Sequence, residues 1–264
     1  MASTVNVVAS CPGKVLILGG YLIVEEPNVG ISIGTTARFT SRVTSSQEGL
    51  DSTCRVHIIS PQFGKEFMFE CRLDKCSGGS IKIVQTAGAA SPFLFYSVLY
   101  AVAASLLSGG EVYRSVIVEL LADNDFYSQR NCLEQQGKVV SVGNLRLVPP
   151  HAPLVGGVSK TGLGSSAAMT SSVVASLYHL FVTHCSKGDK KEGVPGGPNA
   201  VATDDVELIH RVSQIAHCVA QGKVGSGFDV YTAVFGTCAY RRFPPHVLGS
   251  VAGGGESPTS VTLS

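Results

Sequence analysis

Short apolar runs separated by turn-forming residues fill the first third of the chain, and this pattern predicts β-structure. The expected strands are Thr4 to Ser10, Lys14 to Leu18, Ala37 to Thr44, Arg55 to Ser60 and Lys65 to Phe69. Between the first two, the residues Cys11, Pro12 and Gly13 predict a turn.

The hydrophobic period then becomes that of helices. Pro92 to Leu107 is long and apolar and stops before two glycines, which predicts a buried helix with proline in its first turn. Ser165 to Val182 follows a glycine turn and predicts a second helix. A third is expected from Asp204 up to Gly222, with apolar residues at helical spacing between them.

The remaining segments are less regular. Tyr113 to Leu121 and Val139 to Val148 have strand character, with a polar stretch between them. Residues 186–202 are rich in Gly, Pro and Lys and predict an exposed loop. We expect one folded domain over residues 1–245 and a disordered, low-complexity tail over residues 246–264. The order of strands and then helices favours the α+β class.

Composition narrows the classes of function. The 264 residues are 44% hydrophobic and 15% charged, which is enough apolar material for a sizeable core. A net charge of +1 argues against nucleic acid and anionic membranes as partners. The chain has no long apolar run and no secretory signal at its N-terminus. We therefore expect a cytoplasmic protein with small-molecule partners.

The eight cysteines are scattered, and none has zinc-site spacing. Cys71 and Cys76 form the only close pair in the sequence. Buried, reduced thiols are the favoured interpretation, with a single reactive cysteine as the alternative.

The segment from Lys160 to Met169, which reads KTGLGSSAAM, carries the sharpest chemical signal. Glycines allow a ligand to approach the backbone, and the helix that follows directs its unpaired N–H groups and positive dipole end to the same place. The two serines supply hydroxyl oxygens of the kind that Mg²⁺ binds beside phosphates. The segment therefore predicts a phosphate-binding loop. A glycine turn before a helix with nothing bound remains the plain alternative.

Two better-known phosphate motifs fit less well. A Walker A loop needs glycine immediately before its Lys-Thr pair, and here that residue is Ser159. Gly162 to Ala167 does match the dinucleotide pattern G-x-G-x-x-A. The preceding residues are rich in proline and glycine, however, and do not form the buried strand that a Rossmann unit requires. A dinucleotide-dependent oxidoreductase is therefore a remote alternative.

Two further glycine-marked segments carry charged residues. Lys14 follows Pro12 and Gly13, where it could neutralise transferring phosphates. Asp229 follows three closely spaced glycines, where it could orient a substrate or accept a proton. Each alone has an ordinary interpretation, as a solvated surface lysine or a turn aspartate.

The three segments in this order resemble the GHMP small-molecule kinases. Pro12-Gly13-Lys14, Gly162 to Ala167 and Ser226-Gly227-Phe228-Asp229 carry the resemblance. Gly19 to Glu25 and Gly222 to Asp229 are similar to the eukaryotic phosphomevalonate kinases within that superfamily. The resemblance spans residues 5 to about 245. It implies an α+β fold, the ribosomal protein S5 domain 2-like N-terminal domain of GHMP kinases, with helices on one side of mixed strands. The family's C-terminal ferredoxin-like domain, with its third glycine-rich motif, is expected to be absent from these 264 residues.

The resemblance also implies roles for individual residues. The ATP-binding residues would be Lys160, Thr161, Gly162, Leu163, Gly164, Ser165, Ser166, Ala167 and Ala168. Ser166 would also contact Mg²⁺, Lys14 would stabilise the transferring phosphoryl group, and Asp229 would act on the acceptor. Tyr21 and Ser226 would bind the substrate. In mevalonate kinase, a glutamate on the preceding helix ligates the metal. The nearest position in this sequence is His217, which we interpret as a core histidine.

The implied reaction is transfer of phosphate from ATP to 5-phosphomevalonate, giving 5-diphosphomevalonate in the mevalonate route of isoprenoid and sterol biosynthesis. The implied cofactors are ATP and Mg²⁺, and the implied state of a full-length relative is a monomer. A cytoplasmic location is the default, and a peroxisomal one stays open. Two alternatives remain: another GHMP kinase such as mevalonate kinase, and a non-catalytic nucleotide-binding fragment.

Overall fold

A computed structural model of the chain describes residues 4–46, 52–74, 79–183, 203–248 and 258–263. Eight strands within these residues form one mixed sheet in the order β1-β2-β6-β3-β4-β5-β8. Strand β7 pairs with the N-terminal residues of β2, Val29 to Ser32. The β3–β6 pair is parallel, and the other described pairs are antiparallel. The strands are β1 (Thr4–Leu18), β2 (Val29–Ser46), β3 (Thr53–Ser60), β4 (Lys65–Asp74), β5 (Ser80–Ala87), β6 (Ser115–Ala122), β7 (Cys238–Arg241) and β8 (Ser260–Thr262).

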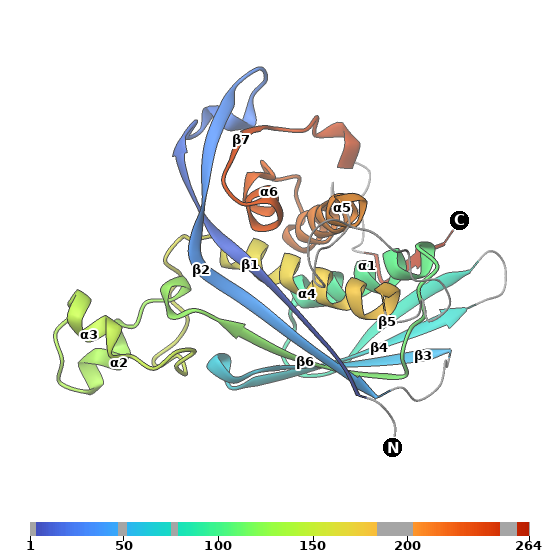
Figure 1. The fold of residues 1–264 in the computed structure, drawn as a ribbon, viewed down its shortest axis with the longest axis horizontal. Coiled ribbons are helices and arrows are strands. Elements are labelled where there is room, and N and C mark those ends of the chain that lie inside the picture. Colours follow the sequence, from blue (N-terminus) through green and yellow to red (C-terminus); the bar gives the residue numbers. More distant parts are fainter. Residues whose placement is uncertain (1–3, 47–51, 75–78, 184–202, 249–257, 264) are drawn as a thin grey trace.

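Helices gather on one side of this sheet, while a small helical projection extends away from it (Figure 1). The helices are α1 (Pro92–Leu107), α2 (Arg130–Gln135), α3 (Val142–Arg146), α4 (Ser165–Thr183), α5 (Thr203–Gln221) and α6 (Phe228–Phe235). Helices α1, α4, α5 and α6 form the layer beside the sheet, and α2 and α3 form the projection. The expected α+β class, with helices on one side of mixed strands, is confirmed.

Helix α4 lies at the centre of the core. It packs against α1, α5, β1 and β2, and its residues Leu177, Leu180 and Phe181 are fully buried. A buried hydrogen bond of 2.7 Å joins the hydroxyl groups of Ser176 on α4 and Ser41 on β2. These contacts hold the C-terminal half of α4 against the sheet, and the helix leads back from there to the glycine loop at its N-terminus.

The three long predicted helices are confirmed. Helix α1 has the predicted bounds, α4 begins at the predicted Ser165, and α5 ends one residue before Gly222. The predicted turn at Cys11 to Gly13 is wrong, because β1 continues through it with a shift of register between Pro12 and Lys14. A bulge absorbs these residues without reversing the chain.

Two other expectations need correction. Residues 139–148, expected as a strand, contain the short helix α3, whose start is capped by Ser141 Oγ accepting the Asn144 N–H at 3.2 Å. Such a cap favours a helix over an extended segment. Part of the predicted tail is a strand: β8 pairs with β5, and Val261 packs against the core. Residues 249–257 of that tail and the predicted loop at 186–202 lie outside the described residues.

Most of the described cysteines are buried, as expected. Cys11, Cys54, Cys71 and Cys218 are buried, Cys132 and Cys238 are partly buried, and all six are free. Burial raises the pKa of the Cys11 and Cys71 thiols to about 12. Within the described ranges, no helix combines the length and hydropathy needed to cross a bilayer.

His210 on α5 gives the domain a pH-dependent stability. Its ring packs 5.2 Å from those of Tyr231 and Phe235, and burial, together with the nearby Arg211, lowers its pKa from 6.5 to about 4. The unfolded chain therefore binds a proton more readily, and stability falls as the pH drops from 6.5 towards 4. We expect a loss of about 2 kcal/mol over this range, and His210→Phe should remove that part. Urea unfolding at several pH values measures it, and equal pH slopes for the two proteins would contradict the prediction.

Candidate active site

The predicted phosphate loop stands directly before helix α4. Gly162 and Gly164 have φ angles of 89° and 75°, a region that favours glycine, so the loop turns sharply into the helix. Its position is fixed from behind, because Thr161 donates its N–H to the Phe126 carbonyl at 3.1 Å and its hydroxyl to the Asp125 carbonyl at 2.6 Å. The first N–H groups of a helix lack partners within the helix. The loop and α4 therefore form a fixed anion-binding geometry.

Lys14 lies against this loop. Its backbone N–H donates to the Leu163 carbonyl at 2.8 Å, and its Nζ donates to the Gly162 carbonyl at 2.9 Å. Nζ also stands 5.5 Å from the centre of the Phe228 ring. Gly13 allows this approach, since a Cβ atom there would lie 2.8 Å from the Leu163 oxygen. The bulge in β1 thus brings a cation to the phosphate loop.

Gly164 supports both the loop and Lys14, so we expect Gly164→Val to weaken ATP binding by about 2–3 kcal/mol through lost hydrogen bonds to charged phosphates. A Cβ atom there would lie 3.0 Å from Lys14 Cγ and 3.1 Å from Lys14 Cε. Gly109→Val is the matched control, because Gly109 has a φ of 76° and open space around it. Calorimetric titration measures the affinity. An unchanged ATP affinity in Gly164→Val would remove this loop from the site.

Asp229 stands in the first turn of α6, close to the phosphate loop. Its Oδ1 accepts the Val230 N–H at 3.0 Å, and its Oδ2 lies 3.9 Å from His217 Nε2. A hydrogen bond of 2.7 Å from Thr232 to Ser32 ties α6 to β2. The sequence predicted only a glycine-rich turn here, so helix α6 is a finding of the structure.

His217 joins the aspartate to the phosphate loop. Its Nε2 lies 3.1 Å from Ser166 Oγ, and the residue is 3% exposed. Burial lowers the pKa of this imidazole; the Asp229 carboxylate opposes that shift and Lys160 reinforces it. The interpretation of His217 as a core histidine was therefore incomplete, since it is buried but contacts two predicted site residues.

A small cavity of about 190 Å³ opens beside Asp229. It is lined by Gln214, His217, Gln221, Lys223, Gly225, Ser226, Gly227 and Asp229. The Ser226 carbonyl accepts the Tyr240 hydroxyl at 2.8 Å, which holds this loop in place. Ser226 is thus brought to the site, whereas Tyr21 is 96% exposed at the tip beyond β1. The role of Tyr21 remains a prediction without a supporting contact.

The protein oxygens suit a Mg²⁺ ion held mainly by phosphates. Among the residues described, no group of three His, Cys, Asp or Glu side chains could hold a metal ion. The Ser166 hydroxyl and the Asp229 carboxylate nevertheless both lie near His217 Nε2, at 3.1 and 3.9 Å. Mg²⁺ at kinase sites commonly uses one or two protein oxygens together with phosphates and water. The donor set therefore fits that kind of site and not a complete protein cage.

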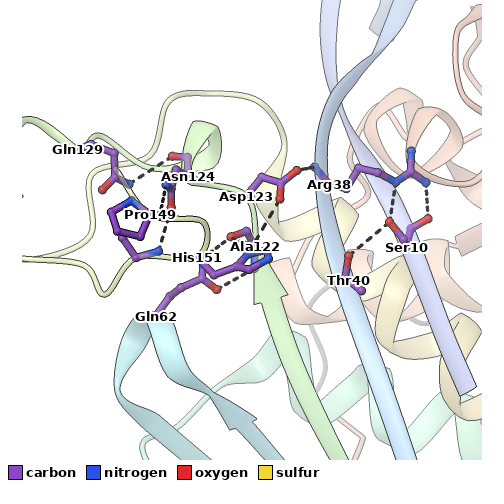
Figure 2. Close-up of polar contacts among 11 residues, drawn as sticks. Ser10, Arg38, Thr40, Gln62, Ala122, Asp123, Asn124, Gln129, Pro149 and His151 are labelled. Carbon is purple, nitrogen blue, oxygen red and sulfur yellow. Dashed lines mark hydrogen bonds and ion pairs between the residues drawn. The ribbon is translucent and has the colours of Figure 1, made fainter. Parts of the chain in front are cut away.

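A larger cavity, of about 730 Å³, lies between the end of β6 and the helical projection. Asp123, Asn124, His151 and Thr161 line it, together with apolar residues of α3. Figure 2 shows the polar contacts that hold this region: Asp123 accepts the Arg38 N–H at 2.8 Å, and Asn124 donates to the Pro149 carbonyl at 2.7 Å. Thr161 belongs both to this cavity and to the predicted ATP-binding segment.

Two residues of the site received no role from the sequence, and a third, His217, was interpreted only in part. Phe228 lies inside the Gly222 to Asp229 segment, and Gln221 lies at the end of the third predicted helix. Gln221 is four positions after His217 on α5, so helical spacing places both on one face. That spacing was the available signal. The contact with Ser166, 51 positions away in the chain, needed the fold.

Comparison with known proteins agrees with this geometry. Residues 150–237 match the family model described as the GHMP kinases N-terminal domain. This match covers the phosphate loop, α5 and the Asp229 turn. The chain contains the N-terminal domain of the GHMP kinases.

Two of the proteins that the chain resembles are named as phosphomevalonate kinases, which is narrower than the family. A peroxisomal phosphomevalonate kinase from Arabidopsis thaliana is 37% identical over 268 residues, covering 92% of this chain and 51% of that protein. The Aspergillus fumigatus phosphomevalonate kinase erg8 is 32% identical, covering 94% of this chain and 53% of that protein. The chain thus spans about half the length of these relatives.

Solved structures support the fold alone. The Streptococcus pneumoniae phosphomevalonate kinase, solved in complex with phosphomevalonate and AMPPNP, superposes with a TM-score of 0.50 at 13% identity. That match covers 92% of this chain and 52% of the other. The expected GHMP N-terminal fold is confirmed.

Proposed function

We propose that this chain carries the ATP-binding and catalytic residues of a phosphomevalonate kinase, which transfers phosphate from ATP to 5-phosphomevalonate. One observation carries the proposal: three segments meet at the loop that precedes α4. Lys14 contacts Gly162 of this loop. His217 contacts Ser166 at the start of α4 and lies beside the Asp229 carboxylate. The similarity to phosphomevalonate kinases supports the choice of acceptor.

Electrostatic stabilisation would supply most of the catalysis. The loop N–H groups and the Lys14 ammonium would bind the phosphate oxygens whose charge develops during transfer. Lys160 adds a second cation near His217. When bound, Mg²⁺ would neutralise charge between the phosphates, and Ser166 Oγ would be its protein ligand.

Asp229 would mainly position the acceptor. A phosphomonoester has a second pKa of about 6, so it is largely dianionic at neutral pH and needs little help from a base. The greater difficulty is bringing two anions together, which Lys14 and the helix N-terminus address. The Asp229 carboxylate lies in the wall of the small cavity, where it can orient the substrate and its cationic neighbours.

The two cavities differ in a way that suits the two substrates. The cavity of about 190 Å³ is smaller than typical ligand pockets, and it offers Lys223 and Ser226 to a small anionic acceptor. The cavity of about 730 Å³ falls within the usual range and adjoins Thr161. We therefore place the acceptor in the smaller cavity and the nucleoside in the larger one.

The test is an assay with two acceptors. The purified chain, with Mg²⁺ and ATP, is given 5-phosphomevalonate or mevalonate, and phosphorylated products are separated and quantified. The proposal expects diphosphomevalonate from the first acceptor and no product from the second. Phosphorylation of mevalonate would favour the alternative GHMP kinase. ATP binding without any product would favour a nucleotide-binding fragment.

We further propose a cytoplasmic or peroxisomal location. The Arabidopsis relative is named as peroxisomal, which supports the second compartment. Imaging of the fluorescently tagged chain would distinguish them, and secretion would contradict both. The monomeric state stays a prediction for full-length proteins of this kind.

A further inference from the structure

The Lys14 side chain is held by neutral groups. Its stem lies against Gly164, where a Cβ atom would be 3.0 Å from Lys14 Cγ. Its Nζ donates to the Gly162 carbonyl at 2.9 Å and stands over the Phe228 ring, 5.5 Å from the ring centre. Among the described residues, no carboxylate forms an ion pair with this ammonium. The cation therefore keeps its full charge beside the phosphate loop.

An aromatic ring suits this task better than a carboxylate. A carboxylate would neutralise the ammonium and compete with phosphate oxygens for its N–H groups. The face of an aromatic ring is partly negative and attracts a cation within about 6 Å of its centre, but it leaves the net charge unchanged. Lysine has three N–H donors. The ring contact of Lys14 can therefore persist when a phosphate oxygen replaces the Gly162 carbonyl.

The Phe228 ring stands on a fixed piece of backbone. Phe228 is partly buried and begins α6, directly after Gly227, whose φ is 85°. A Cβ atom on Gly227 would lie 2.6 Å from the Tyr240 hydroxyl, so the chain packs tightly here. The Phe228 carbonyl accepts the Thr232 hydroxyl at 2.7 Å, and the same hydroxyl is hydrogen-bonded to Ser32 Oγ at 2.7 Å. The start of α6 is thus tied to β2, the strand that pairs with β1.

We propose that Phe228 is a positioning residue for the Lys14 ammonium. Its ring face holds the cation beside the phosphate loop before a phosphate arrives, and it keeps the cation aligned when Nζ moves from the Gly162 carbonyl to a phosphate oxygen. Phe228 thereby couples the first turn of α6, which carries Asp229, to the loop before α4. This inference rests on the proposed function for its effect on rate, but not for the contact between ring and cation.

The contact is tested without any assay of activity. In NMR spectra of the chain with ¹³C-labelled lysine, the protons on Lys14 Cε should lie upfield of those of the other lysines, because the ring current of Phe228 shields them. Lys14→Met identifies the signal. In Phe228→Leu the upfield displacement should disappear, whereas Phe228→Tyr, which keeps an aromatic face, should retain it. The matched control is Phe235→Leu, on the same helix and 40% exposed, which should leave the signal in place.

Two results of this comparison would overturn the proposal. One is a Lys14 signal that is not displaced in the original chain. The other is a displacement that survives in Phe228→Leu or is lost equally in Phe235→Leu. If the leucine variant does not fold, the loss or retention of the displacement is read from the fluorinated rings described next, which keep the size of phenylalanine.

The rate separates positioning from packing. Mono-, di- and trifluorinated phenylalanine at position 228 weaken the negative face of the ring in steps while nearly keeping its shape. We expect kcat to fall with each step, reaching about fivefold with three fluorines, while the KM for ATP changes less than about twofold. The same series at Phe235 should leave kcat constant. A constant kcat in the Phe228 series, or an equal fall in both series, would overturn the positioning role. If the original chain shows no turnover, the proposed function fails, and the NMR comparison alone decides whether the ring holds Lys14.

Discussion

Replacing Lys14 with methionine should lower the rate of phosphoryl transfer by about a thousandfold. The ammonium is the cation that β1 brings to the phosphate loop, where it lies 2.9 Å from the Gly162 oxygen. Methionine has a similar length and packs against Gly164 in a similar way, but it cannot stabilise the charge that develops on the transferred group. Because Lys14 Nζ is exposed, the free energy of unfolding should change by less than about 1 kcal/mol.

The control for this variant is Lys82→Met, which removes an exposed lysine from β5. Initial rates at saturating ATP and acceptor measure kcat for both proteins, and urea unfolding measures their stability. Lys82→Met should match the original chain. A kcat for Lys14→Met within tenfold of the original would show that the lysine does not act on the transferring group.

Changing Asp229 to asparagine should reduce kcat by about a hundredfold without making it more dependent on pH. Asparagine keeps an oxygen that can accept the Val230 N–H, so the first turn of α6 stays intact. It removes the charge that faces His217 and the small cavity. If the carboxylate positions the substrate, the loss should be the same at each pH above the second pKa of the acceptor.

A pH–rate profile decides between positioning and base catalysis. If Asp229 were a base, hydroxide would partly replace it, and the activity of Asp229→Asn would recover as the pH rises. Such a recovery above the acceptor's second pKa would contradict the positioning role. The profile of the unchanged protein, measured beside it, separates this recovery from the ionisation of the acceptor.

The sequence predicted the parts of the site that are contiguous in the chain. Glycines before an apolar helix have a local physical meaning, and the loop at Gly162 and Gly164 has the expected form. The bounds of α1 were equally local, because Pro92 begins the helix and glycines follow it. The resemblance then implied that Lys14, which precedes the loop in the chain, and Asp229, which follows it, act together with the loop.

Contacts between distant segments were beyond local patterns. Val261 lies in a short polar segment, and only pairing with β5 makes it a strand residue. His217 and Gln221 follow the helical period, which records burial but does not identify the partner across the interface. In the same way, Pro12 and Gly13 predict a turn by propensity, while pairing with β2 on both sides keeps the chain extended.

The most direct test of the account is a crystal structure of the chain with Mg²⁺ and a non-hydrolysable ATP analogue. The β- and γ-phosphate oxygens should accept hydrogen bonds from the N–H groups at the start of α4. Lys14 Nζ should then leave the Gly162 carbonyl and contact the γ-phosphate, with Asp229 on the far side of that phosphate. Phosphates bound elsewhere, with Lys14 Nζ still on Gly162, would contradict the claim that these segments form one phosphoryl-transfer site.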